Sequence, residues 1–509
     1  MDFYSYHIFY FPFKWEIKGK ENEILSEQVD LDNIPISSYS MWERVQIDDS
    51  QHSQLDTKEQ EELFAERQYY FDFVHPVLYD MKNVENSIIH HYERREPKES
   101  NVEYHIKVKD KTYVLRLDAL NVNLYSTGVG IMSFYLKNEK ESQKDENSIR
   151  DINQFGRRIM PPHCGEFSQG GRGMLAESIQ IIGLLGDKLR YSDSFDYVKG
   201  VGTSLKRGFE CVWQPAWFIK HLIEDLSPNM KVTPVIDDRM LVNCWYGNDN
   251  LSNKIKTADI DGKVPFLYSD LWYKHLFVDN GNDATCQNEV MKKRLLEEST
   301  YCRWQKNGTL YGLSRYSLVA LTDTQWFAKN VLAVHMRTIY SRMFELVILQ
   351  RASMLRFSGE VTKVSALKGN DNKKLSERIA SLYKEYIRFI NQIYFRSVTT
   401  QDQGIEMYEM LLRQFDSASQ IKDLDEEISE LHQYVSLMID QRRNEDGETL
   451  NIMAAIFLPA TLLSGIFGMN PFGGNKEWIS LGAQVLFITI VTITTSVFLC
   501  RKILKNRRK

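Results

Sequence analysis

Two stretches of the chain carry residues that suit a phosphate-bearing ligand. The first combines a glycine-rich turn with an adjacent pair of arginines, and its candidate residues are Thr127, Gly128, Gly130, Asn153, Arg157 and Arg158. Glycine lets backbone N–H groups approach a ligand closely, and a guanidinium group binds two phosphate oxygens at once. The spacing is neither a P-loop nor a dinucleotide fingerprint. Arginines that only pair within the fold are the more frequent explanation of such a pattern.

The second stretch, LYGLSRYSLVALTDTQWFA, offers Arg315, Tyr316 and Trp326. An aromatic ring can stack on a base while an arginine holds a phosphate. Aromatic residues that pack in a core are again the more frequent explanation. The two stretches together make up the predicted ligand-binding residues.

Nothing in the sequence indicates catalysis. The six cysteines are scattered, without the close spacing of a zinc or redox motif, so we expect reduced thiols in the cytosol. There is no nucleophile elbow and no kinase signature. The formal net charge of −5 does not favour a nucleic-acid-binding protein. We therefore expect a chain that is not an enzyme and has no direct contact with nucleic acid.

Two uncharged runs near the C-terminus predict a membrane hairpin. The first is 450–470 and the second is 478–500, and only the loop 471–477 separates them. Twenty helical residues at ~1.5 Å rise cover about 30 Å, the thickness of the hydrocarbon core. Basic residues are concentrated in the tail 501–509 and just before the first run, which predicts that both termini are cytoplasmic. The expected location is the inner (plasma) membrane. Two buried core helices are the alternative.

Polar and small residues along the first run predict a pore. Asn444, Asn451, Leu458, Thr461, Gly465 and Gly468 recur at three, four or seven residues and share one helical face. Polar groups in hydrocarbon need partners or water, and several copies of this face would enclose a water-filled path. The candidate pore residues are Asn470, Met469, Gly468, Thr461, Leu458, Asn451, Leu450 and Asn444. The alternative is that the small residues are helix-packing contacts.

A heptad pattern precedes the membrane segment. Apolar residues step by three and four from Ile421 to Met438, which predicts one nearly continuous helix, 405–470, of stalk plus pore. Helices are also expected over 373–398 and from Thr324 to Ser358. The acidic stretch 445–448 would form charged rings in an oligomer, or else a solvated turn around Gly447.

The region before these helices reads as mixed α+β. Alternating apolar and polar residues predict strands at 103–108 and 113–117, the glycine-opened run 127–136 predicts another, and the aromatic N-terminus predicts a fourth. The predicted organisation is an α+β cytoplasmic sensor region (1–320), a helical hairpin and stalk (321–449), transmembrane helices at 450–470 and 478–500 joined by an external loop (471–477), and a cytoplasmic tail (501–509).

The segment IFLPATLLSGIFGMN resembles the first transmembrane helix of CorA magnesium transporters, whose signature is Gly-Met-Asn. The resemblance implies a funnel-shaped homopentamer in a lipid bilayer, with this helix lining the pore, Asn470 as selectivity ring and Mg²⁺ as the transported ion. Two departures put cation recruitment in question. Phe467 stands where many members have tyrosine, and Glu477 is the only acidic residue of the loop.

The runs TGVGIMSFYLKN, NQFGRRIMPP and HMRTIYSRMFELVILQRASMLRFS, upstream of such a pore, resemble the CorA-like membrane effectors associated with type III CRISPR systems. This resemblance implies that a nucleotide second messenger, an S-adenosylmethionine–AMP conjugate, acts through the soluble domain on the pore. The rival interpretations are a magnesium or divalent cation transporter gated by the ion itself, and a membrane-anchored enzyme acting on a nucleotide.

Overall fold

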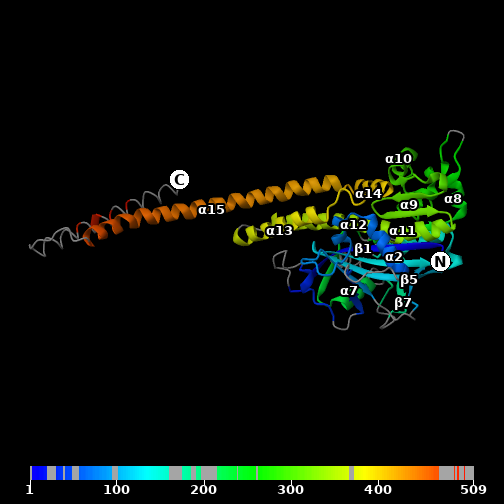
Figure 1. The fold of residues 1–509 in the computed structure, drawn as a ribbon, viewed down its shortest axis with the longest axis horizontal. Coiled ribbons are helices and arrows are strands. Elements are labelled where there is room, and N and C mark those ends of the chain that lie inside the picture. The colour runs from blue at the N-terminus through cyan, green and yellow to red at the C-terminus, as the bar shows by residue number, and fades with distance from the viewer. Residues whose placement is uncertain are drawn as a thin grey trace, which may run out of the picture. The chain divides into compact units, whose positions relative to one another are not determined.

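The structure is a computed structural model, and it divides into two compact units, Met1–Ile428 and Ser429–Lys509. It describes residues 3–19, 30–37, 41–48, 57–94, 101–159, 175–184, 191–195, 215–237, 239–259, 262–365 and 372–468, and five single positions after 486. The first unit contains a large sheet and the helices that cover it (Figure 1). The helices that follow residue 320 belong to this same unit as far as Ile428, and the predicted domain bounds stay a prediction.

Within the described residues the sheet has 13 strands in the order β11-β12-β13-β10-β1-β6-β5-β4-β7-β8, with β2 paired to β3, β3 to β5 and β9 to β1. The strands are β1 (Ser5–Ile17), β2 (Trp42–Arg44), β3 (Ile89–Arg94), β4 (Glu103–Val108), β5 (Lys111–Tyr125), β6 (Val129–Asn138), β7 (Ser178–Ile182), β8 (Ser192–Asp193), β9 (Met230–Pro234), β10 (Leu241–Gly247), β11 (Thr300–Tyr301), β12 (Leu310–Leu313) and β13 (Ser317–Thr322). Neighbouring strands are antiparallel except β10 and β13, which are parallel. The α+β class and the four predicted strands are confirmed.

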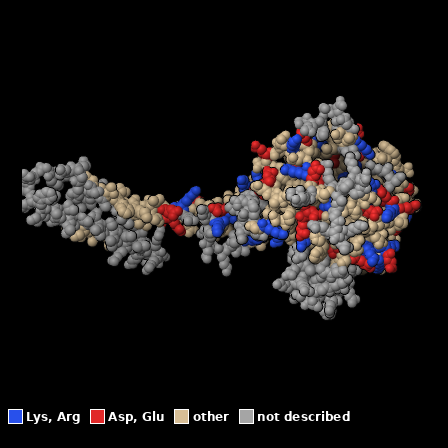
Figure 2. All heavy atoms as spheres, turned by 90° about the horizontal axis from the view of Figure 1, so that it is seen from below, with Lys and Arg blue, Asp and Glu red and all other residues tan. Residues whose placement is uncertain are grey.

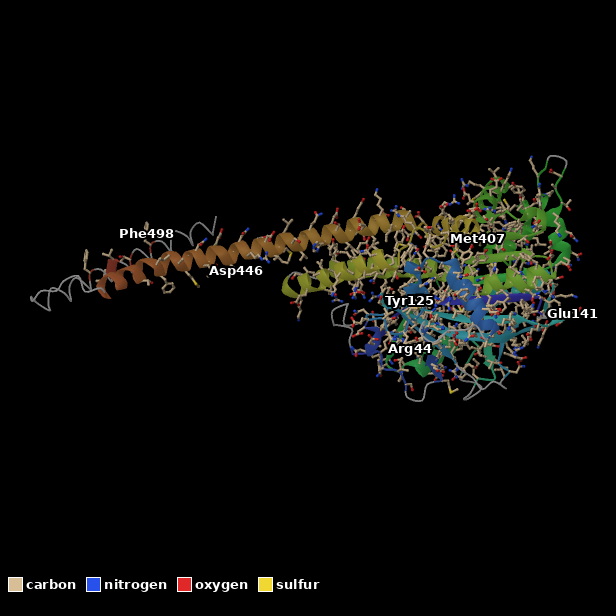
Figure 3. The ribbon with its side chains drawn as sticks, viewed as in Figure 1. Arg44, Tyr125, Glu141, Met407, Asp446 and Phe498 are labelled. Carbon is tan, nitrogen blue, oxygen red and sulfur yellow. The ribbon has the colours of Figure 1, made fainter. Side chains whose placement is uncertain are left out.

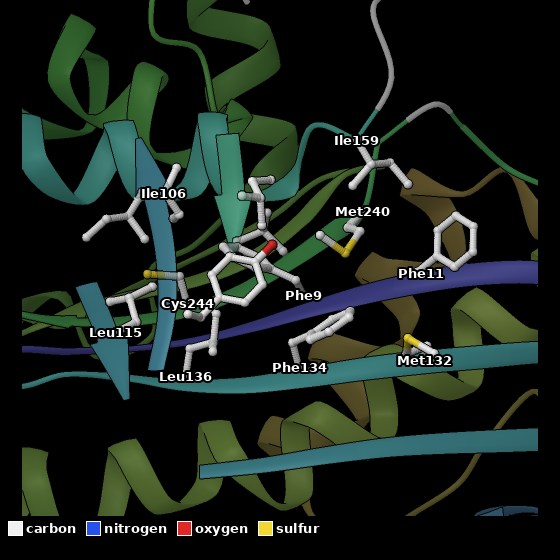
Figure 4. Packing of buried hydrophobic residues seen from close by; sticks show 14 of the residues in the cluster. Phe9, Phe11, Ile106, Leu115, Met132, Phe134, Leu136, Ile159, Met240 and Cys244 are labelled. Carbon is white, nitrogen blue, oxygen red and sulfur yellow. The ribbon is translucent and has the colours of Figure 1, made fainter. Parts of the chain in front are cut away.

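Strand β1 lies at the centre of the sheet and is buried on both faces. Phe9 and Phe11 belong to a core that also contains Phe134 and Met240 (Figure 4). On the opposite face the ring of Tyr10 packs edge-on against Phe344, with centroids 5.7 Å apart. A strand buried on both faces has no polar alternation, which explains the aromatic N-terminal sequence.

Helices cover both faces of the sheet. They are α2 (Lys58–Tyr69), α3 (His75–Leu78), α4 (Glu146–Arg157), α7 (Trp217–Leu226), α8 (Asp249–Lys256), α9 (Asp270–Phe277), α10 (Glu289–Ser299), the π-helix η7 (Ala328–Leu332), α11 (Ala333–Arg337), α12 (Ile339–Ser365), α13 (Asn372–Gln392), α14 (Asp402–Gln414) and α15 (Ser417–Gly468). Helices α4 and α7 contribute to the core around Phe9, and α12 packs on the other face of β1 and β6 (Figure 1).

A buried polar network fixes α12 to the sheet. The carboxylate of Glu345 accepts hydrogen bonds from Asn123 and, at 3.3 Å, from the hydroxyl of Tyr125. Arg342, one turn earlier, lies 3.6 Å from Glu345 and 3.3 Å from Glu66 of α2. Burying a charge costs free energy unless the charge has a partner. These contacts therefore favour one position of α12 on the sheet.

Two predicted helices are interrupted. The helix expected over 405–470 is split into α14 and α15, because Asp416 adopts a left-handed backbone conformation (φ 52°) that an α-helix cannot contain. The helix expected from Thr324 to Ser358 consists of η7, α11 and α12, with a break at Thr338. Both breaks lie at residues other than glycine or proline, so the sequence pattern did not reveal them.

The remaining helical predictions agree more closely with the structure. The helix expected over 373–398 is α13, which ends at Gln392. In the heptad stretch Leu424 and Ile428 are buried, and the hydroxyl of Tyr386 donates to Asp425 at 3.2 Å. The start of α15 therefore packs on α13.

Helix α15 contains the first predicted membrane segment up to Gly468. The predicted external loop 471–477, the predicted tail 501–509 and all but five residues of 478–500 lie outside the described residues. Among the helices that the structure describes, none has the combination of length and hydropathy needed to cross a membrane.

Candidate ligand sites and candidate pore helix

The two predicted arginines lie at the C-terminal end of α4 and are buried. Arg157 donates from one terminal nitrogen to the carbonyl of Val278 at 3.2 Å and to the side chain of Gln154 at 3.3 Å. Arg158 forms an antiparallel backbone bridge with Arg239. A positive charge is favourable at a helix C-terminus, where the carbonyl groups point outward.

Tyr316 brings the two predicted ligand stretches together. Its ring centroid lies 5.9 Å from the guanidinium carbon of Arg157 and 4.4 Å from that of Arg239. Arg239 in turn donates two hydrogen bonds to Asp237, at 2.9 and 2.6 Å. We call Arg157, Arg158, Arg239 and Tyr316 the arginine cluster. Arginine is well suited to binding phosphate, and its guanidinium group also stacks on aromatic rings.

The backbone explains why these residues meet. Strands β10 and β13 are parallel, with Val242 opposite Ser317, so the residues just before each strand are neighbours. The amide of Met240 donates to the carbonyl of Arg157 at 2.8 Å, and the amide of Val242 donates to the carbonyl of Tyr316 at 2.9 Å. Sequence reasoning missed Arg239, because its only local signal is its position just before an apolar strand.

A cavity of about 880 Å³ adjoins Tyr316, and we call it the junction cavity. It is lined by the turn between β12 and β13, by the end of α10 and by the end of α14. Three arginines line it, Arg294, Arg315 and Arg413, together with two glutamates of α10. Arg294 pairs with one of these glutamates at 3.8 Å. The lining is therefore mixed in charge with an excess of arginine.

Arg315 connects this cavity to the junction of α14 and α15. Its Nε donates to the carbonyl of Gln414, the last residue of α14, at 2.9 Å. The side chain of Gln414 donates to the carbonyl of Glu298 at 3.0 Å and to the hydroxyl of Ser299 at 3.1 Å. The turn at Asp416 follows immediately, so the contacts around the cavity determine how α14 ends.

A second arginine, Arg351 of α12, lies close enough to Arg315 for their charges to interact. Burial and the nearby charge of Arg315 lower the pKa of Arg351 on α12, and Asp416 opposes this effect. A neighbouring cation disfavours the charged form of an arginine, and a bound anion would relieve that repulsion. Arg315 and Tyr316 were both predicted from the sequence, and both line the junction cavity.

The glycine-rich part of the first stretch lies elsewhere and packs into the fold. Gly128 has φ 72° in the turn between β5 and β6. A Cβ at Gly130 would lie 2.4 Å from the ring of Phe13. Thr127 is buried, with its hydroxyl 2.9 Å from that of Ser353. The structure therefore explains these three residues by turn geometry and close packing, and does not place them at the junction cavity.

Asn153 and Trp326 are also separate from the arginine cluster. The side-chain oxygen of Asn153 lies 2.7 Å from Nδ1 of the buried His7, and burial lowers the pKa of His7 to about 4. Trp326 is 72% exposed, and its neighbours Gln325 and Phe327 line a second cavity. Of the nine predicted ligand residues, the structure thus groups Arg157, Arg158, Arg315 and Tyr316.

The predicted pore residues up to Gly468 lie on α15. Leu450 is 67% exposed and Leu458 is 62% exposed, and Asn444, Asn451 and Thr461 are exposed too. The hydroxyl of Thr461 donates to the carbonyl of Phe457 at 2.7 Å, which satisfies it within the helix. Met469 and Asn470 lie outside the described residues. Large exposed apolar side chains on one helix indicate contact with another surface.

Charge ends abruptly along α15. Asp446, labelled in Figure 3, and its neighbour Glu445 are exposed, and Gln441 donates to Glu445 at 3.3 Å. Glu448 is exposed as well, and beyond it the described atoms of the helix belong to neither acidic nor basic residues (Figure 2). Residues around Gly447 are helical, so the alternative of a solvated turn does not apply.

The described residues contain no group of three or more histidine, cysteine, aspartate or glutamate side chains arranged to hold a metal ion. The Mg²⁺ ion expected from the sequence is a transported ion, for which a resident site of this kind is not required.

Comparison with known proteins places a recognisable domain at the C-terminal part of the chain. Residues 330–502, about a third of the chain, match the family described as CorA-like Mg²⁺ transporter protein. This match supports a membrane cation channel or transporter, and it begins inside the π-helix η7. No curated protein is significantly similar in sequence.

One solved structure, titled "structure of the full-length CmaX protein", is 14% identical to this chain. The similarity covers 52% of this chain and 88% of that one, with a TM-score of 0.19. At this TM-score the likeness carries no argument about fold or function.

Proposed function

We propose that this chain is one subunit of a CorA-like membrane pore for cations, opened by a nucleotide second messenger that binds to the N-terminal unit. The observation that carries the proposal is the match of residues 330–502 to CorA-like Mg²⁺ transporters, since it covers α12 to α15. The N-terminal unit adds a large sheet region to that domain, and the proposed ligand site lies where the sheet region meets the end of α14.

The pore requires several copies of the chain. A helix hairpin cannot enclose a water-filled path alone, and α15 presents exposed leucines together with Asn451 and Thr461. A homopentamer, as the Gly-Met-Asn resemblance implies, would bury these side chains around an axis. Leu450 and Leu458 would then form apolar constrictions that close by excluding water.

The ligand that fits best carries phosphate. The junction cavity, about 880 Å³, has the size of a small-molecule site, and arginines line it. Tyr316 lines this cavity, and the guanidinium carbons of Arg157 and Arg239 lie 5.9 and 4.4 Å from its ring centroid. A conjugate of S-adenosylmethionine and AMP combines a phosphate with aromatic and polar groups. We therefore propose it as the ligand and the protein as an antiviral effector of type III CRISPR systems.

Arg315 supplies a route from the ligand to the pore. In the structure its Nε holds the carbonyl of Gln414, next to the break that precedes α15. A phosphate that binds Arg315 competes for the same donor, because the guanidinium prefers an anionic acceptor. Occupancy would therefore change how α14 ends and how α15 begins. Opening a mostly closed pore needs about 5 kcal/mol, or ~1 kcal/mol from each of five sites.

A magnesium or divalent cation transporter gated by the ion itself is the second candidate. The description of the matched family as Mg²⁺ transporters favours it directly. In that case the junction cavity would have no part in gating, and opening would depend on the concentration of Mg²⁺ alone.

The test measures ligand binding by calorimetry and ion flux in liposomes, with the full chain and the S-adenosylmethionine–AMP conjugate. We expect ligand-dependent flux, and its loss in the double variant Arg157→Ala, Arg158→Ala. Because both side chains are buried, thermal unfolding must show that this variant still folds.

Arg315→Ala is the sharper variant, since Arg315 is exposed and its removal leaves no buried charge unpaired. We expect binding at least tenfold weaker, as a charge-assisted hydrogen bond contributes ~1.5–3 kcal/mol. Arg116→Ala, which removes an exposed arginine of β5 paired with Glu139, is the matched control and should bind normally. Flux that responds to Mg²⁺ but not to the conjugate would favour the transporter.

A further inference from the structure

A second cavity, of about 670 Å³, lies between segments that are far apart in the sequence. It is formed by the end of α2, the loop after β11, the π-helix η7 with the following α11, and the loop that leads into α14. We call it the aromatic cavity, because Tyr69, Trp304, Phe327 and Tyr340 line it. None of its lining residues is shared with the junction cavity.

The rings of this cavity are held in fixed orientations. Tyr340 packs edge-on against Tyr69, with centroids 6.3 Å apart, and against His335 at 6.0 Å. The indole N–H of Trp304 donates to the side chain of Gln403 at 2.8 Å. Trp304 is nevertheless 41% exposed and Phe327 57% exposed. The guanidinium carbon of Arg303 lies 6.0 Å from the ring centroid of Trp304, and the rest of this part-exposed ring is open to a flat partner.

The charges of the cavity disfavour an anionic ligand. Arg303 is already engaged by Glu406 at 2.7 Å and lies 3.6 Å from Asp402. Asp323 and Asp402 both line the cavity. Burial lowers the pKa of His335, which keeps its ring uncharged at neutral pH. A phosphate would therefore meet carboxylates here and would have to displace an existing ion pair of Arg303.

The polar groups that remain suit an uncharged heterocycle. Gln325, Gln401 and Gln403 line the cavity. An amide side chain offers both donors and an acceptor, although the oxygen of Gln403 already accepts the hydrogen bond from the indole of Trp304. Such groups can match the edge of a ring that carries nitrogen and oxygen atoms. The volume is within the range of small-molecule sites. The π-helix η7 contributes Ala328, Val331 and Leu332 to the wall of the cavity. Such helices are rare in proteins and occur frequently at functional sites.

We infer that the aromatic cavity binds an uncharged, planar nitrogen heterocycle of nucleoside size, stacked against Trp304 and hydrogen-bonded through the glutamine side chains. The site is distinct from the proposed phosphate-binding site at Arg315. The two sites contact opposite ends of α14: Asp402 and Gln403 begin this helix, and Gln414 ends it. A ligand bound in the aromatic cavity would contact both the start of α14 and the loop after β11.

The experiment titrates adenosine into the full chain in detergent and measures binding by calorimetry. We expect saturable 1:1 binding per chain, and Trp304→Ala should weaken it about tenfold or more, since stacking on an aromatic side chain contributes strongly to base binding. Phe327→Ala is a second variant at an exposed position and should also weaken binding. AMP should bind no more tightly than adenosine, because Arg303, among the described residues that line the cavity, is already paired with Glu406.

Two controls separate this inference from the proposed function. Trp217→Ala removes an exposed tryptophan of α7 that does not line the cavity and should leave adenosine binding unchanged. Arg315→Ala should also leave it unchanged, although it weakens the phosphate-bearing ligand. Absence of adenosine binding at millimolar concentration, or binding that depends on Arg315 and not on Trp304, would overturn the inference without affecting the proposed pore.

Discussion

Acidification should destabilise the N-terminal unit through His7. Its ring is fully buried on β1, with Nδ1 2.7 Å from the side-chain oxygen of Asn153 and Nε2 2.8 Å from the hydroxyl of Ser5. Burial lowers the pKa of His7 from 6.5 to about 4. Between these two values the unfolded chain binds a proton that the folded chain does not, so stability falls as the pH falls from 6.5 to 4.

The size of this effect follows from the shift. A difference of about 2.5 pK units corresponds to about 3 kcal/mol when the window is crossed completely, and about 2 kcal/mol of it is lost between pH 7 and pH 5. For a unit of this length, unfolding entropy is ~0.9 kcal/mol per kelvin, so the melting temperature should fall by about 2 °C. Burial also lowers the pKa of His275 to about 3, and this side chain should contribute a similar amount.

The assay compares the melting temperatures of the full chain at pH 7 and pH 5 with those of His7→Gln. Glutamine cannot take up the proton, so the decrease on acidification should be about 2 °C smaller in the variant, and smaller again when His275→Gln is added. If the melting temperature of His7→Gln falls by as much as that of the unmodified chain, then His7 is not held as a buried, uncharged ring in the folded protein. Asn153 would then be available to a ligand, as the sequence had suggested.

Three further predictions concern packing, gating and assembly. Gly130→Ala should lower the free energy of unfolding by ~1–3 kcal/mol, because the new Cβ meets Phe13, whereas Gly359→Ala, with no atom within 4 Å, should be neutral or stabilising. Equal thermal shifts in the two variants would contradict a packing role for Gly130. Leu458→Asp should keep the pore hydrated and raise ion leakage from liposomes; unchanged conductance would mean that this face of α15 points away from the axis. Native mass spectrometry in mild detergent should detect a pentamer, and a stable monomer or dimer would refute the assembly.

Local patterns in the sequence were sufficient for many elements of this protein. The alternation at 103–108 and the apolar spacing at 373–398 correspond to β4 and α13, because periods of 2 and 3.6 residues express which face of an element is buried. The Gly-Met-Asn resemblance agrees with the family match at 330–502. Both signals are carried by residues close together in the chain, so no knowledge of the fold was needed to read them.

The candidate site depended on contacts that no local pattern records. The sequence shows Arg157 and Tyr316 as separate signals, and the parallel pairing of β10 with β13 puts them within 5.9 Å and adds Arg239. The sequence pattern predicts that Gly130 lets a phosphate approach the backbone. In the structure the ring of Phe13 occupies the space that a Cβ would need. A glycine indicates that some group approaches the backbone closely, but the sequence does not show which group it is.

The break between α14 and α15 also depends on contacts between distant parts of the chain. Asp416 has the only positive φ among the described residues of 402–468, and the turn it makes is held by neighbours from elsewhere in the chain. Phe415 packs against Phe344, and Gln414 is bound by Arg315 and by the end of α10. The sequence alone predicted a helical segment over 405–470, and the helical content of α14 and α15 agrees with that prediction. Only the tertiary structure decided where that segment bends, because the groups that stabilise the bend come from distant parts of the chain.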